Sequence, residues 1–415
     1  MASAYEAIPC HDPNPNDGPI PWNRERLRIL SHNECRPAVS PTLQYSGGFG
    51  VRPCRSPADL PLVAGARSGK MAHVKSILPL ILVAIALPSP AAETNELAIR
   101  LQALEEASAH RDLRHSRLLN ELLWFQRLSD MAVVDKVRFA GPPPRGTNAA
   151  APPPGSNDVV VAALTFMPRQ RESSKKLPLI VLVHGEIHGN VASDEDANVV
   201  RDLIRQGYAV IAPDYRGSSG YGLDYWRLID YGGREVDDVH AARQYMLERH
   251  PEIDPTRVGV AGWSHGGLIA LLVVFQHPDD FAACYAGVPV SDLEERIRIR
   301  GKDYENLFAA PYHIGKSLAE DPEEYRQRSP AWNAEKLRTP LLIHANTNDE
   351  DVTVREVRQL ITALESAGRS FDYHIYTNAP GGHFFNRLDT PLAVASRTEI
   401  WQFLARYLQP PEKAR

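Results

Sequence analysis

The chain has 415 residues and combines 46 lysine and arginine residues with 51 aspartate and glutamate residues, which gives a formal net charge of −5 at pH 7. By length it has room for two or three domains. A chain with a net negative charge does not attract the phosphate backbone of a nucleic acid, so we expect no nucleic-acid partner. Only the part after about residue 155 alternates apolar and polar stretches as a globular fold does.

Residues 1–92 contain an unpatterned segment followed by an apolar one. Residues 1–70 are rich in proline and arginine and show no periodicity. At 71–92 a methionine and a positive residue precede an eleven-residue apolar core and a small-residue end, a pattern typical of a secretory signal peptide. The core is short for a bilayer, so we predict no stable membrane span.

From these patterns we expect translation to begin at Met71. Residues 1–70 would then be a non-native or disordered extension, and 71–92 a signal peptide that directs export to the periplasm or out of the cell. The alternative for the apolar core is a buried helix or a signal anchor.

Residues 93–156 are predicted to form a helical arm and a proline-rich linker. Leucines at positions 97, 101 and 104 share one helical face, and more leucines follow at 118, 119, 122 and 123. One or two helices would pack on the following domain or on a second subunit, which leaves a homo-oligomer open. The prolines and glycines between 141 and 155 indicate a linker or a long hairpin loop.

Residues 157–410 are predicted to form one α/β domain. Apolar strands alternate there with amphipathic helices expected at 192–206, 234–249, 265–276, 354–367 and 392–408. This alternation predicts a mostly parallel central sheet with helices on both faces. The stretch 291–328 is rich in glutamate and arginine, and we expect it to form a small helical cap. A plain pair of solvated helices is the alternative.

The turn Gly262-Trp263-Ser264-His265-Gly266 follows a β-branched strand and precedes an apolar helix. In this strand–turn–helix context a Gly-x-Ser-x-Gly sequence presents a nucleophilic serine. The turn is so tight that side chains at 262 and 266 would collide with neighbouring backbone. Ser264 is therefore the candidate nucleophile, and an ordinary glycine-rich turn is the alternative.

A serine hydroxyl needs a base and an orienting carboxylate to become a nucleophile. The strand at 340–345 leads into a loop with Asp349, and the strand at 371–376 leads into a glycine-rich loop with His383. The carboxyl ends of successive parallel strands are where such sheets place their sites. We predict that His383 acts as general base and then acid, and that Asp349 fixes its tautomer.

Two alternatives remain for these partners. Three acids crowd one loop, so Glu350 or Asp351 could replace Asp349 as the orienting group. His383 could also be a solvated surface histidine.

Together these segments resemble the catalytic domain of the prolyl oligopeptidase family of serine peptidases, particularly its acylaminoacyl-peptidase and dipeptidyl-peptidase branches. The resemblance covers about 157–408 and rests on the motifs at 207–222, 231–239, 262–267 and 329–344. It implies an α/β-hydrolase fold and an acyl-enzyme mechanism. Large members carry a β-propeller before this domain, whereas about 60 residues precede it here after the expected cleavage site, too few for two blades.

The resemblance also implies an oxyanion hole made by the backbone amides of Glu186 and His265. The family's loop often reads His-Gly-Gly-Pro-His-Gly, whereas this chain has His184-Gly185-Glu186-Ile187-His188-Gly189. The Glu186 carboxylate could repel the oxyanion or bind a substrate amine.

His184, Glu186 and His188 are residue types that can ligate a metal. They lie on a loop, however, whereas the His-Glu-x-x-His motif of zinc proteases places both histidines on one face of a helix. We therefore predict no metal and no cofactor.

The function predicted from the sequence is a serine hydrolase that cleaves short peptides, in the manner of an aminopeptidase. A carboxylesterase with the same triad is the first alternative, since acyl transfer does not reveal the leaving group. A non-catalytic binding protein on a hydrolase scaffold is the second. The expected substrate is a small peptide or ester.

Overall fold

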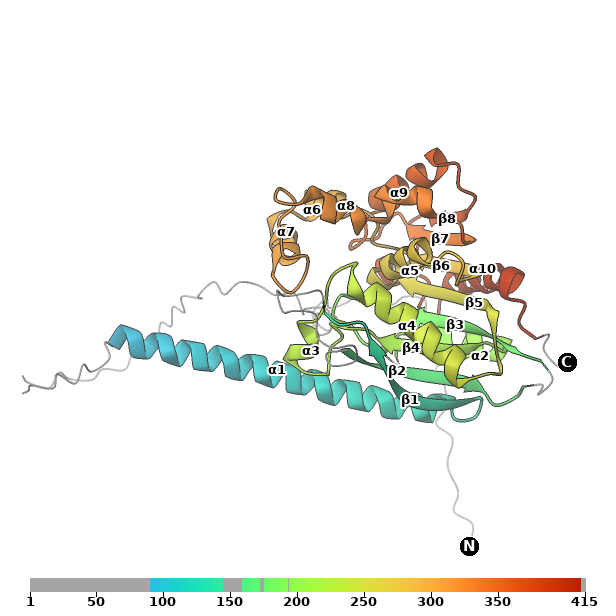
Figure 1. Ribbon diagram of the computed structural model, residues 1–415, viewed down its shortest axis with the longest axis horizontal. Coiled ribbons are helices and arrows are strands. Elements are labelled where there is room, and N and C mark those ends of the chain that lie inside the picture. Colours follow the sequence, from blue (N-terminus) through green and yellow to red (C-terminus); the bar gives the residue numbers. More distant parts are fainter. Residues whose placement is uncertain (1–89, 145–158, 172–174, 193, 412–415) are drawn as a thin grey trace, which may run out of the picture. The chain divides into compact units, whose positions relative to one another are not determined.

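The computed structural model describes residues 90–144, 159–171, 175–192 and 194–411. The expected extension, almost all of the expected signal peptide and most of the proline-rich stretch lie outside the described residues. Within these ranges eight strands form one sheet, in the order β1-β2-β4-β3-β5-β6-β7-β8 (Figure 1). The strands are β1 (Ala132–Gly141), β2 (Val159–Pro168), β3 (Leu177–Val183), β4 (Ala209–Asp214), β5 (Ile253–Trp263), β6 (Ala283–Gly287), β7 (Leu341–Asn346) and β8 (Asp372–Tyr376).

The sheet is mostly parallel, as predicted. β2 is antiparallel to both β1 and β4, and every pairing from β4 through β3, β5, β6 and β7 to β8 is parallel. All seven residues of β3 are buried. A strand covered on both faces needs an unbroken apolar sequence rather than an alternating one, which is what Leu177–Val183 provides.

Helices cover both faces of the sheet and divide the core in two. One buried cluster joins the sheet to α4 (Arg234–Arg249), α5 (His265–Gln276) and α9 (Val354–Ser366). The other joins it to α2 (Ala197–Gln206) and α10 (Pro391–Leu408), together with the end of α1. Between β4 and α4 there is one further turn, α3 (Leu223–Trp226).

The stretch expected to form a helical cap is helical. It contains α6 (Leu293–Arg300), α7 (Lys302–Ala309) and α8 (Pro322–Gln327), followed by 3₁₀ turns at Pro330–Trp332 and Ala334–Lys336. Asp292 begins α6 because its side chain accepts hydrogen bonds from the free amides of Glu294 and Glu295.

The sheet begins earlier in the chain than expected. β1 lies in the segment predicted to be arm and linker, yet it pairs with β2 from Ala132 opposite Pro168 to Gly141 opposite Val159. Three charged residues interrupt its apolar pattern, which is common on an edge strand and hides the strand from a periodicity search.

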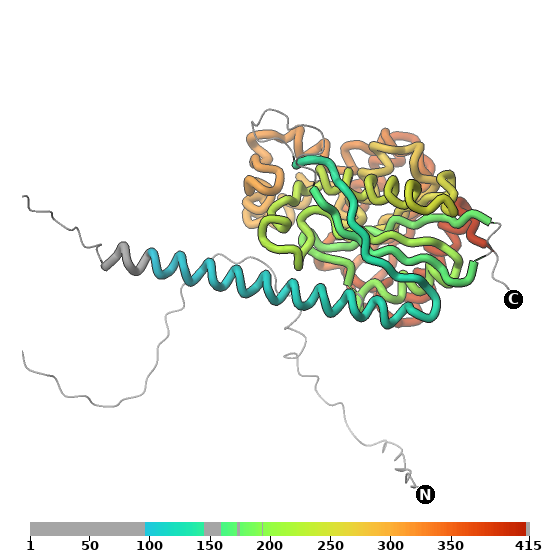
Figure 2. The backbone as a smooth tube through the Cα atoms, turned by 60° about the horizontal axis from the view of Figure 1, so that its bottom comes forward, coloured from blue at the N-terminus to red at the C-terminus, as the bar shows by residue number. Residues whose placement is uncertain are grey.

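The arm itself is one continuous helix, α1 (Pro90–Leu128). Its last turns pack on the domain, where Trp124 and Leu128 are fully buried and the Trp124 indole donates to the Val191 carbonyl at 3.1 Å. Its first half extends past the rest of the fold (Figure 2). None of the helices in the described ranges has an apolar stretch long enough to cross a membrane.

Candidate active site

Ser264 lies on a strained corner between β5 and α5. Its φ is 58° and its ψ is −120°, a conformation that costs a non-glycine residue about 1–3 kcal/mol. A Cβ on Gly262 would lie 2.2 Å from the Gly266 carbonyl oxygen, and one on Gly266 would lie 2.4 Å from the Val183 carbonyl oxygen. Both collisions are with backbone, so these two positions admit only glycine, as the sequence predicted.

The main chain around Ser264 is fixed by hydrogen bonds to the sheet and the helix. The Ser264 amide donates to the Gly287 carbonyl on β6 at 2.9 Å, and the Ser264 carbonyl accepts from Leu268 in α5 at 3.1 Å. His265 is the first residue of α5, so the free amides of the helix begin beside the serine. These hydrogen bonds keep the Ser264 backbone in its strained conformation.

His383 and Asp349 meet at the carboxyl ends of β7 and β8. His383 Nδ1 lies 2.7 Å from Asp349 Oδ2, and the Asp349 side chain is 1 % exposed. The other oxygen, Asp349 Oδ1, accepts hydrogen bonds from the amides of Asp351 at 2.8 Å and Val352 at 2.9 Å. A carboxylate held on both oxygens keeps the imidazole in one orientation and places the proton on Nδ1.

Asn346, at the end of β7, ties the two loops together. Its side-chain nitrogen donates to the carbonyls of Ala379 at 3.1 Å and Gly382 at 2.9 Å, and its oxygen accepts from the Ala379 amide at 3.0 Å. Asn346 is fully buried. It fixes the backbone next to His383, a role that the sequence analysis missed because an asparagine at a strand end resembles any loop residue.

Asp351, one of the alternative acids, lies on the opposite side of the imidazole. Its Oδ2 is 3.6 Å from His383 Nε2, and its Oδ1 accepts from Arg296 at 3.1 Å and from Arg300 at 2.7 Å. Burial acts to raise the pKa of Asp351, but Arg296, His383 and Arg300 together hold it below its usual range. The two arginines are on α6, so this carboxylate joins the cap to the site.

The Ser264 hydroxyl needs a hydrogen bond to its base in order to act as a nucleophile. Among the hydrogen bonds of the described residues, none joins it to His383. In substrate-free enzymes such a bond is often long and tightens when substrate binds. Ser264 lies beside the loop that follows β3, because a Cβ on Gly185 would be 3.6 Å from the serine Cβ.

The loop after β3 passes close to Ser264 and carries Glu186. Glu186 has a φ of 59°, and its carbonyl accepts from the Tyr215 hydroxyl at 2.9 Å. In the described part of the chain, the amides of Glu186 and His265 donate to no other group. Desolvation and the nearby Glu195 carboxylate raise the pKa of Glu186. Two free amides beside a serine can accommodate a developing oxyanion.

The two loop histidines have structural partners. His184 Nε2 lies 3.0 Å from the Ser218 hydroxyl, and His188 Nδ1 lies 2.8 Å from the Gly217 carbonyl. Burial lowers the pKa of His184 to about 3 and that of His188 to about 4, so both rings are neutral at pH 7.

The His265 ring lies in the protein interior below the serine. It is 1 % exposed, and its Nε2 lies 3.5 Å from Glu235 Oε1. The ring also contacts Tyr231, with centroids 4.7 Å apart. The ring is thus packed against an acid of α4.

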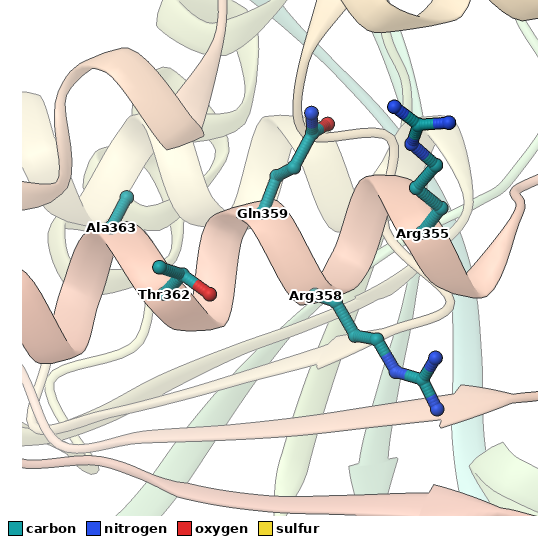
Figure 3. A pocket seen from close by; sticks show the side chains of 5 residues that line it. All are labelled: Arg355, Arg358, Gln359, Thr362 and Ala363. Carbon is teal, nitrogen blue, oxygen red and sulfur yellow. The ribbon is translucent and has the colours of Figure 1, made fainter.

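Two features of the described residues lie apart from this constellation. His240, His277 and Asp280 are close enough together to ligate a metal, but Arg243 already places a positive charge 3.1 Å from Asp280. A hollow of about 370 Å³ lies along α9 and is lined by side chains of that helix (Figure 3). None of the predicted site residues lines it.

Comparisons with known proteins agree with the motifs. A family model described as the prolyl oligopeptidase family matches residues 194–410. The chain is 32% identical over 229 residues to an uncharacterized peptidase, YuxL, of Bacillus subtilis, covering 54% of this chain and 33% of that protein. It is 28% identical over 239 residues to the acylamino-acid-releasing enzyme of Arabidopsis thaliana, covering 56% of this chain and 31% of that protein.

Among solved structures, the acylaminoacyl peptidase of Pyrococcus horikoshii is similar with a TM-score of 0.56 and 20% identity, covering 71% of this chain and 45% of that one. A puromycin hydrolase is similar with a TM-score of 0.55 and 23% identity, covering 68% of this chain and 40% of that one. These likenesses establish the α/β-hydrolase fold. The chain spans about a third of the length of the two curated relatives named above.

Proposed function

Because the chain belongs to the prolyl oligopeptidase family of serine peptidases, we propose that it hydrolyses short peptides with Ser264, His383 and Asp349 as a catalytic triad. The observation that supports this most is the 2.7 Å contact between His383 Nδ1 and Asp349 Oδ2 at the same sheet edge as the strained Ser264. A strained backbone costs stability and is typically kept where function uses it, and here the strained serine and the oriented imidazole lie at the same edge of the sheet.

In the proposed reaction the Ser264 oxygen attacks the carbonyl carbon of the scissile bond and its proton passes to His383 Nε2. The amides of Glu186 and His265 hold the resulting oxyanion. The C–N bond then breaks, and His383 gives the proton to the leaving amine. Water, activated by His383, hydrolyses the acyl-enzyme and restores Ser264.

The proposal includes a preference for peptides with a free amino terminus. Within the described residues, the Glu186 side chain has no hydrogen-bond partner. It is close enough to His383 and Asp351 for their charges to affect its pKa. A carboxylate in this position can attract an α-ammonium group, which needs a charged partner when it leaves water. This supports aminopeptidase-like rather than acylaminoacyl-peptide cleavage.

The test compares three substrates that share one aminoacyl group: a free-amine naphthylamide, its N-acetyl form, and a short acyl ester. We expect the free-amine amide to give the highest kcat/KM. Ester turnover with no amide turnover would favour the carboxylesterase alternative. No turnover, together with no labelling by a fluorophosphonate serine probe, would favour a binding protein.

Export is a separate proposal and rests on the sequence pattern at 71–92. N-terminal sequencing of the native protein should find no peptide from before Met71. A peptide from residues 1–70 would overturn it.

A further inference from the structure

Large apolar side chains are exposed along one face of α1. Leu97, Leu104, Leu119 and Leu122 are each more than 60 % exposed. On the opposite side of the helix, about half a turn away, Arg117 and Trp124 are buried and the Arg117 side chain donates to the Gly220 carbonyl at 3.0 Å. Contact with the domain therefore leaves the leucine face uncovered.

The exposed residues follow a heptad repeat. Leu97, Leu101 and Leu104, and then Leu118, Leu122 and Phe125, are separated by four and three residues in turn. The same spacing places Ser108, Arg111 and His115 between the two groups. We call these nine positions the open stripe. A stripe with a period of 3.5 residues fits a second helix and not a flat surface.

The charges of α1 show how a second helix would be oriented. Between residues 96 and 110 there are three acidic side chains and one basic one, whereas between 111 and 128 there are four arginines and two acids. An antiparallel neighbour of the same sequence would place each acidic half beside a basic half. A parallel neighbour would place Arg111 against its own copy, which like charges disfavour.

We infer that two copies of this chain associate through their α1 helices, paired antiparallel along the open stripe. In the register of an antiparallel coiled coil, Leu101 of one copy lies opposite Leu118 of the other, and Leu97 opposite Leu122. The first half of each helix, which extends past its own domain (Figures 1 and 2), then covers the leucines beside the domain of the second copy. This pairing does not depend on the proposed peptidase activity.

The first test is the mass of the full chain by size-exclusion chromatography with light scattering. We expect a dimer at micromolar concentration, and a monomer for the double variant Leu101→Glu/Leu118→Glu. Ile99→Glu is the matched control, because Ile99 is 61 % exposed on the same helix but lies off the open stripe. Circular dichroism would verify that each variant is folded. A monomeric wild type, or a dimer that survives the double variant, would overturn the inference.

Cross-linking tests the orientation. In a background with Cys10, Cys35 and Cys54 replaced by serine, only the buried Cys284 remains. The double variant Leu101→Cys/Leu118→Cys should form an interchain disulfide on mild oxidation, and Leu101→Cys alone should not. Efficient cross-linking by Leu101→Cys alone would indicate parallel helices and contradict the proposal. So would a monomer that binds anionic lipid vesicles through the open stripe.

Discussion

Asp351 Oδ2 lies 3.6 Å from His383 Nε2, on the ring nitrogen opposite the one that Asp349 holds. The imidazole therefore has a carboxylate at each nitrogen. In the proposed mechanism Nε2 is the atom that takes the proton of Ser264. Arg296 and Arg300 of α6 pair with Asp351 and so connect this carboxylate to the cap.

The first prediction concerns stability in acid. The pKa of Asp351 is lowered in the folded protein, so its contribution to stability is complete above the unfolded value near 4 and is lost as the pH falls through the folded value. We expect Asp351→Asn to lower the free energy of unfolding at pH 7 and to flatten its decrease below about pH 4.

Urea denaturation of both proteins between pH 2.5 and 7 would check this. Glu350→Gln is the control, since it removes the neighbouring negative charge but leaves the arginine contacts of Asp351 intact. Two proteins with parallel stability curves over the whole range would contradict the role given to Asp351.

The second prediction concerns Asn346 as a positioning residue. Asn346→Ala leaves the Ala379 amide without its buried acceptor, so the free energy of unfolding should fall by about 1–3 kcal/mol. Because the loop that carries His383 loosens, kcat should fall about 10- to 100-fold while KM changes little. Loss of stability with an unchanged kcat would assign Asn346 a purely structural role.

The third prediction concerns the free amino terminus of the substrate. A charge-assisted hydrogen bond contributes about 1.5–3 kcal/mol, so Glu186→Gln should lower kcat/KM for a free-amine substrate by roughly 10- to 100-fold. The N-acetyl substrate should be affected far less. Glu195→Gln is the matched control, because it removes the same charge from a nearby position. Equal losses on both substrates would argue against amine recognition by Glu186.

Local rules explain why Ser264 could be predicted from sequence. The two glycines and the strand–turn–helix context lie within a dozen residues, and the collisions that exclude other residues at 262 and 266 are contacts with nearby backbone. His383 and Asp349 required one more inference, that successive parallel strands end at the same edge of a sheet. That inference predicts which loops lie together but not which side chains touch. Asp349, Glu350 and Asp351 therefore all remained candidates for the orienting acid.

The contacts of the cap could not be predicted in this way. Arg296 and Arg300 belong to a helix whose charged sequence looks like that of any solvated helix. They are separated from Asp351 by 55 and 51 residues in the sequence, and only the fold brings them into contact with it. β1 was missed for a related reason. Its charged residues are typical of an edge strand and hide the apolar pattern. Its pairing with β2 joins segments that are separated in the sequence, so local patterning does not reveal it.

The most direct test of the proposed triad is to map, by mass spectrometry, the residue that a fluorophosphonate probe modifies in the full chain. We expect one adduct, on Ser264, that disappears in Ser264→Ala and is at least about 10³-fold slower to form in His383→Ala. An adduct on another residue, or an equal labelling rate without His383, would contradict it.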